Sequence, residues 1–101
     1  MPATFDRQQV FDDFCDRRMG ALSSSGFRTW MTLFRHAHEQ DGRVTMTQAE
    51  LARHARASVA TVRRGLAELR ALDLVACTDT RNGTREGAMT YALQTPGTEA
   101  N

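Results

Sequence analysis

The sequence predicts a small α+β domain, in which four helices are followed by a C-terminal β-hairpin. Three observations support this prediction. The chain has 101 residues, which is enough for one modest hydrophobic core. Apolar residues recur at helical spacing as far as residue 72. Beyond residue 73, two segments with the composition of strands flank Asn82-Gly83, a dipeptide that favours the tight turn of a hairpin.

The first helix is expected over residues 4–19, with Thr4 as its N-cap and Gly20 at its end. Two interpretations of its apolar stripe remain open. The stripe covers the core of its own chain, or Phe11 and Phe14 pack against a second copy and form a two-fold homodimer. The opposite face is acidic, which most simply keeps the helix solvated.

A second helix is expected over residues 25–39, after a run of serines that offers several N-caps. It carries the strongest core signal of the sequence, namely Phe27, Trp30, Met31, Leu33, Phe34 and Ala37. We expect Asp41-Gly42 to end this helix and residues 43–46 to form a short edge strand.

Two short helices joined by a tight turn follow. The segment TQAE at 47–50 fits a capping box made by Thr47 and Glu50, and it predicts a helix over residues 48–55. Arg56-Ala57 makes the turn, and Ser58 caps a further helix over residues 59–72. Its inward face is expected to hold Val59, Val62, Leu66, Leu69 and Leu72, and its opposite face Ala60, Arg64, Ala67 and Ala71.

Two strands are expected over residues 74–80 and 84–93. If Asn82-Gly83 sets their register, Leu74 and Ala76 share a face with Tyr91 and Met89. The chain then divides into an N-terminal helix (1–22), a main domain (23–94) and a flexible polar tail (95–101).

Charge is distributed unevenly along the chain. All 13 basic residues are arginine, a composition that a GC-rich genome also produces. Residues 1–20 hold three arginines against four aspartates, whereas residues 43–72 hold six arginines against two glutamates. Positive charge therefore gathers on the two short helices, as a phosphate-facing surface requires.

Several classes of protein do not fit the sequence. No apolar run approaches the length of roughly 18 residues that a membrane span needs, and no secretory signal is recognisable, so we expect a protein of the reducing cytoplasm. Cys15 and Cys77 lie far apart, which argues against a zinc knuckle. His36 and His38 fall on opposite faces of a helix and cannot share an ion. We expect no metal, no cofactor and no catalytic site.

The segment from Thr47 to Val75 resembles winged helix-turn-helix DNA-binding domains, such as those of the GntR and MarR repressor families. It is also similar to the winged helices of plasmid and phage replication initiators. The sharpest part, SVATVRRGL at 58–66, matches the pattern SxxTVxRxL, and the likeness covers about residues 25–93. Two positions depart from it. Asp73 stands where glycine is usual, and Gly65 lies within a helix, which a close crossing by another helix would explain.

The resemblance implies that the helix after Ser58 enters the major groove and that the hairpin, as a wing, contacts the minor groove or the backbone. The candidate DNA-binding residues are Thr47, Arg53, Arg56, Ser58, Ala60, Thr61, Arg63, Arg64, Arg81, Asn82 and Arg85. For the arginines, a solvated charged surface is the alternative. Arg53 and Arg56 could also pair with Glu50 or Asp73.

We therefore expect sequence-specific binding of double-stranded DNA by a small transcriptional regulator, such as a dimeric repressor carried by a plasmid or phage, with no small-molecule effector. A replication-initiation or partition protein is one alternative. A winged-helix module for protein interaction, without affinity for DNA, is another.

Overall fold

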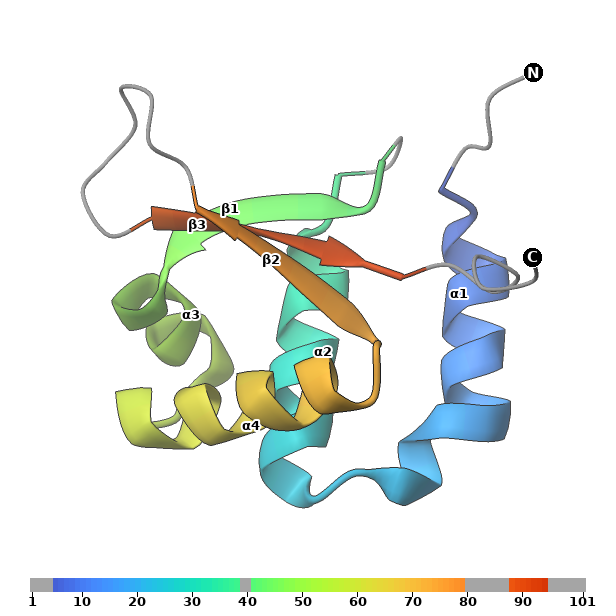
Figure 1. Cartoon of the computed structure of the whole chain (residues 1–101), viewed down its shortest axis with the longest axis horizontal. Helices are drawn as coiled ribbons and strands as arrows, with labels where there is room; N and C mark the ends of the chain where they lie inside the picture. The colour runs from blue at the N-terminus through green and yellow to red at the C-terminus, as the bar shows by residue number, and fades with distance from the viewer. Residues whose placement is uncertain (1–4, 39–40, 80–87, 95–101) are drawn as a thin grey trace.

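The computed structural model of the chain describes residues 5–38, 41–79 and 88–94, which form an α+β fold (Figure 1). Its helices are α1 (Arg7–Asp13), α2 (Ser24–His36), α3 (Gln48–Ala55) and α4 (Val59–Ala71). Its strands are β1 (Arg43–Thr47), β2 (Val75–Asp79) and β3 (Ala88–Leu93). The strands form one antiparallel sheet in the order β1-β3-β2, so that β1 is an edge strand, as expected.

The N-terminal helix differs from the prediction at both ends. Its N-cap is Asp6, whose carboxylate accepts a hydrogen bond from the backbone N–H of Gln9 at 3.1 Å, so Thr4 does not cap it. After α1 the chain continues through a π-helical turn (Phe14–Arg18) and a 3₁₀ turn (Met19–Ala21). Gly20 lies within that last turn and does not adopt the left-handed conformation of a glycine cap.

Phe14 belongs to the core of its own chain. Its side chain is 1% exposed, and its ring stacks on that of Trp30 with the centroids 3.6 Å apart. This burial fits the interpretation in which the stripe covers the core of its own chain, and packing of Phe11 and Phe14 against a second copy stays a prediction. Phe11 is half-buried and lies 5.5 Å from the ring of Phe34.

Helices α2 and α4 cross at Gly65. A Cβ atom at this position would overlap the side chain of Thr29 and the backbone carbonyl oxygen of Ser25, both of which belong to α2. The close crossing inferred from the sequence is therefore confirmed. Near the same contact, Glu68 accepts hydrogen bonds from the backbone N–H and the hydroxyl of Ser23, the N-cap of α2.

The sheet register differs from the one that a two-residue turn at Asn82-Gly83 would set. Cys77 pairs with Tyr91 and Ala76 with Ala92. This register is offset by three residues from the expected one, and an odd offset exchanges the two faces of a strand. Val75 is accordingly buried and Ala76 exposed. Residues 82–83 themselves lie outside the described residues.

Candidate nucleic-acid interface

Helix α3 begins with the capping box that the sequence predicts. The Thr47 hydroxyl accepts a hydrogen bond from the Glu50 N–H at 3.0 Å, and the Glu50 carboxylate accepts one from the Thr47 N–H at 2.9 Å. Both observed bounds of α3 agree with the prediction. The cap uses the Thr47 N–H and one acceptor position of the Thr47 hydroxyl, so the hydroxyl keeps its proton as a hydrogen-bond donor.

Three residues, 56–58, connect α3 to α4. Arg56 adopts the left-handed conformation, with φ of 55°, and its N–H donates to the carbonyl oxygen of Arg53. The neighbouring carbonyl of Ala55 accepts a hydrogen bond of 2.9 Å from the guanidinium of Arg28, which reaches over from α2. This contact fixes the end of α3 against α2.

Ser58 caps α4, as expected. Its hydroxyl accepts a hydrogen bond from the Thr61 N–H at 3.1 Å and forms another with the Thr61 hydroxyl at 2.9 Å. Ser58 and Ala60 are exposed and Thr61 is half-buried. The first turn of α4 therefore presents small side chains to solvent, and such a surface lets another molecule approach the helix backbone closely.

Helix α4 is anchored by the residues on its inner face. Val62 and Leu69 are fully buried and Leu66 is 5% exposed. Val59 and Leu72 were expected to lie inward as well, but they are 36% and 37% exposed. Both stand at the ends of the helix, where the neighbouring elements no longer cover it. Beyond Leu72, Asp73 takes up the left-handed conformation inferred for it, with φ of 60°.

Arg63 and Arg64 are exposed in the second turn of α4. The Arg63 Nε donates to the Gln48 Oε1 at 3.4 Å and so links α4 to the start of α3. Arg64 projects away from Val62 and Leu66, and among the described residues its guanidinium has no hydrogen bond or ion pair.

Arg53 and Arg56 are also exposed, and the described part of the chain provides no ion pair for either of them. The pairing with Glu50 or Asp73 considered from the sequence is therefore not seen. Helix α3 and the first turns of α4 lie side by side at the edge of the molecule opposite α1 (Figure 1). Arg53, Arg56, Arg63 and Arg64 therefore lie on two neighbouring helices and the turn that joins them.

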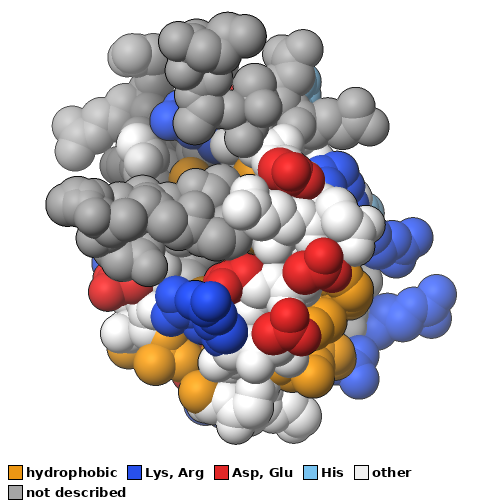
Figure 2. Space-filling model, turned by 90° about the vertical axis from the view of Figure 1, so that its right-hand side faces the viewer, with side chains coloured by type: hydrophobic (Ala, Val, Ile, Leu, Met, Phe, Trp, Pro, Cys, Tyr) orange, Lys and Arg blue, Asp and Glu red, His pale blue; other side chains and the backbone are white. Residues whose placement is uncertain are grey.

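The face formed by α1 is different. Figure 2 shows acidic and basic side chains next to each other on that face. Arg17 and Arg18 each place their Nε atom 3.6 Å from a carboxylate oxygen of Asp13. Positive charge is compensated there, whereas Arg53, Arg56 and Arg64 have no ion pair within the described part of the chain.

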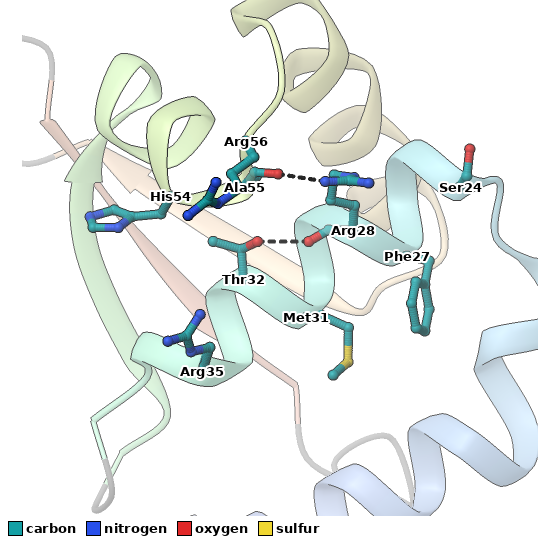
Figure 3. A pocket seen from close by; sticks show the side chains of 9 residues that line it. All are labelled: Ser24, Phe27, Arg28, Met31, Thr32, Arg35, His54, Ala55 and Arg56. Carbon is teal, nitrogen blue, oxygen red and sulfur yellow. Dashed lines mark hydrogen bonds between the residues drawn. The ribbon is translucent and has the colours of Figure 1, made fainter.

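Sequence reasoning missed the contribution of α2 to the basic surface. A groove of about 480 Å³ beside α2 and α3 is lined by Arg28, Arg35, His54 and Arg56, and by Phe27 and Met31, which project from α2 on the side away from α3 (Figure 3). The signal was present in the sequence, because residues seven apart, such as Arg28 and Arg35, share one face of a helix. It was hidden by the strong core pattern of the same helix.

The histidines do not gather into a metal site. The ring of His36 lies 4.5 Å from that of His54, centroid to centroid, while His38 lies near Asp41. Among the described residues, no group of three or more His, Cys, Asp or Glu side chains could hold a metal ion.

The hairpin residues Arg81, Asn82 and Arg85 lie outside the described residues, so their part in the site stays a prediction, as does the tail at 95–101.

No described helix combines the length and the apolar character that crossing a membrane requires. Comparisons of the chain with protein-family models, curated proteins and solved structures find no match.

Proposed function

We propose that this protein binds double-stranded DNA in a sequence-specific manner, as a small transcriptional regulator, with α4 in the major groove. One observation carries the proposal. The outer surface of α3 and α4 presents Arg53, Arg56 and Arg64 without an ion pair in the described part of the chain, while leucines hold α4 from behind.

The chemistry of these residues suits a DNA duplex. A guanidinium group matches the two acceptors of a guanine edge in the major groove and also binds phosphate oxygens. Arg63 and Arg64 occupy the early turns of α4, the part of a recognition helix that reaches base edges. Arg53 and Arg56 flank the turn, where contacts to the phosphate backbone would set the orientation of the protein.

The order of the elements also supports the proposal. From α2 onward the chain runs helix, strand, helix, helix, strand, strand, which is the order of the winged helix-turn-helix domains that the sequence resembles. In that arrangement the segment between β2 and β3 is the wing, and Arg81, Asn82 and Arg85 would contact the minor groove or the backbone.

Selection of bound fragments from a random duplex pool tests the proposal and returns a motif. A palindromic motif would indicate a two-fold dimer. Binding to the selected site should then weaken steeply as salt concentration rises, because each phosphate contact releases a counterion. A pool that yields no enriched sequence at low salt would overturn the proposal.

A second candidate is a protein-interaction module. The groove beside α2 and α3 favours it, because its lining combines Phe27, which is 38% exposed, with arginine side chains, as an acidic and partly apolar peptide would require. Such a module would show no affinity for DNA.

A replication or partition protein would use the DNA surface described above and would be recognised by many tandem sites in the selected fragments.

A further inference from the structure

A second concave surface, separate from the groove beside α2 and α3, lies between α4 and the sheet. It measures about 220 Å³ and receives residues from four elements. Gln48 of α3 and Arg63 of α4 stand at it and are joined by their hydrogen bond. The remaining lining residues are Leu66, Ala67, Arg70, Cys77, Met89 and Tyr91. We call this surface the α4–sheet groove.

The groove has an unsatisfied polar group at its base. Tyr91 is 1% exposed, and its hydroxyl is buried without a hydrogen-bond partner in the described part of the chain. Leaving a buried hydroxyl unpaired is costly in free energy, so native proteins rarely keep one without a role. Burial raises the pKa of Tyr91 to about 12, and the neighbouring Cys77 contributes to the rise. The phenol therefore keeps its proton at neutral pH and can act as a donor.

Charge and shape define what would fit the groove. Arg63 and Arg70 are exposed cations on its α4 side, and none of its lining residues is acidic. Leu66, Ala67 and Met89 supply apolar contact in the same groove. The volume suits a molecule smaller than the drug-sized ligands that fill pockets of roughly 300–1,000 Å³.

We propose that the α4–sheet groove binds a small organic carboxylate, whose carboxylate oxygens accept hydrogen bonds from Arg63, Arg70 and the Tyr91 hydroxyl and whose apolar body lies over Ala67 and Met89. Because Arg63 also belongs to the candidate DNA surface, the ligand draws positive charge from that surface and weakens DNA binding. This regulatory part rests on the proposed function, whereas the binding of the carboxylate does not.

The two cysteines offer a test in the unmodified chain. Cys77 lies in the groove and is half-buried, whereas Cys15 lies in the turn after α1 and serves as an internal control. The chain is treated with iodoacetamide, and the alkylation rate of each cysteine is followed by mass spectrometry. Hexanoate is the probe, and hexanamide is its neutral counterpart of the same size.

We expect hexanoate to slow alkylation of Cys77 and not of Cys15, and hexanamide to slow neither. In Tyr91→Phe and Arg70→Gln, half-protection should need roughly tenfold more hexanoate, since each loses one hydrogen bond to a charged group. The comparison uses the hexanoate concentration that gives half-protection, because replacing Arg70 also changes the alkylation rate of the Cys77 thiol in the absence of hexanoate. An absence of protection, equal protection of both cysteines, or unchanged half-protection in both variants would overturn the site.

Measuring DNA binding in the presence of hexanoate distinguishes the carboxylate site from the proposed function. If the chain binds its selected duplex, hexanoate should weaken that binding over the concentrations that protect Cys77. DNA binding that is unaffected by saturating hexanoate would overturn the regulatory role. Protection of Cys77 in a chain that binds no DNA would support the carboxylate site and refute the proposed function.

Discussion

The side chain of Thr29 in α2 occupies the space that a Cβ atom on Gly65 of α4 would need. The carbonyl oxygen of Ser25 lies 2.6 Å from that position, slightly farther than the Thr29 hydroxyl, and a backbone atom cannot rotate away. The orientation of α4, and with it the direction in which Arg64 projects, depends on this contact between two helices.

Substitution of Gly65→Ala should therefore destabilise the protein. In a free helix the change would gain about 1 kcal/mol. Here the overlap with α2 should outweigh that gain, and we expect the free energy of unfolding to fall by roughly 1–3 kcal/mol in a urea titration. Gly20→Ala is the matched control, because a Cβ at Gly20 meets nothing within 4 Å. Equal stability of Gly65→Ala and wild type would show that the helices cross less closely than described.

The capping box of α3 gives a second prediction. Thr47→Ala removes the hydroxyl that accepts from the Glu50 N–H, and it should lower the free energy of unfolding by about 1 kcal/mol. Ser24→Ala, an exposed change within α2, is the control. Thermal unfolding followed by circular dichroism measures both. A similar melting temperature for the two variants would argue against the box.

Phe14 distinguishes a core helix from a dimerisation helix. Because its ring is buried against Trp30, Phe14→Ala should cost roughly 3–5 kcal/mol at every protein concentration. Phe11→Ala, at a half-buried position, should cost less. If Phe14 instead joined two subunits, its variant would be a folded monomer, and light scattering across a dilution series would reveal it.

Above pH 10, the free energy of unfolding should depend on the ionisation of Tyr91. Its pKa rises from 10.0 to about 12, because burial disfavours the tyrosinate. The contribution of the protonated Tyr91 to the free energy of unfolding is therefore complete below pH 10 and is lost as the pH rises through 12. The chain has one tyrosine and no lysine, and the neighbouring group with a raised pKa is the Cys77 thiol, which burial shifts upward from 9.0. Tyr91→Phe should remain stable over the interval in which wild type loses stability; parallel decline of both proteins would contradict this assignment.

Much of the helical structure could be predicted because its signals are local. The caps at Thr47 and Ser58 require only residues three positions apart, and the left-handed Asp73 follows from the end of a helix. The strand register could not be predicted in this way. The local preference of Asn82-Gly83 competes with the pairing of β3 to β1, which joins Tyr91 to Val44.

The candidate site was predictable in part for the same reason. Arg63 and Arg64 follow from helical spacing after Ser58. The role of Arg28 does not, because its partner, the carbonyl of Ala55, lies 27 residues away along the chain. The α4–sheet groove was also hidden, since its residues come from four elements that only the fold brings together.

The central claim is that the exposed arginines of α3 and α4 contact a DNA duplex. Fluorescence anisotropy of the selected duplex, measured over a salt series, tests it most directly. We expect Arg64→Ala to weaken specific binding by roughly 1–3 kcal/mol, and Arg53→Ala to weaken all sequences alike and reduce the salt slope by about 1. Arg17→Ala, on the α1 face, should bind like wild type. Wild-type affinity and salt slope in both Arg64→Ala and Arg53→Ala would contradict the claim.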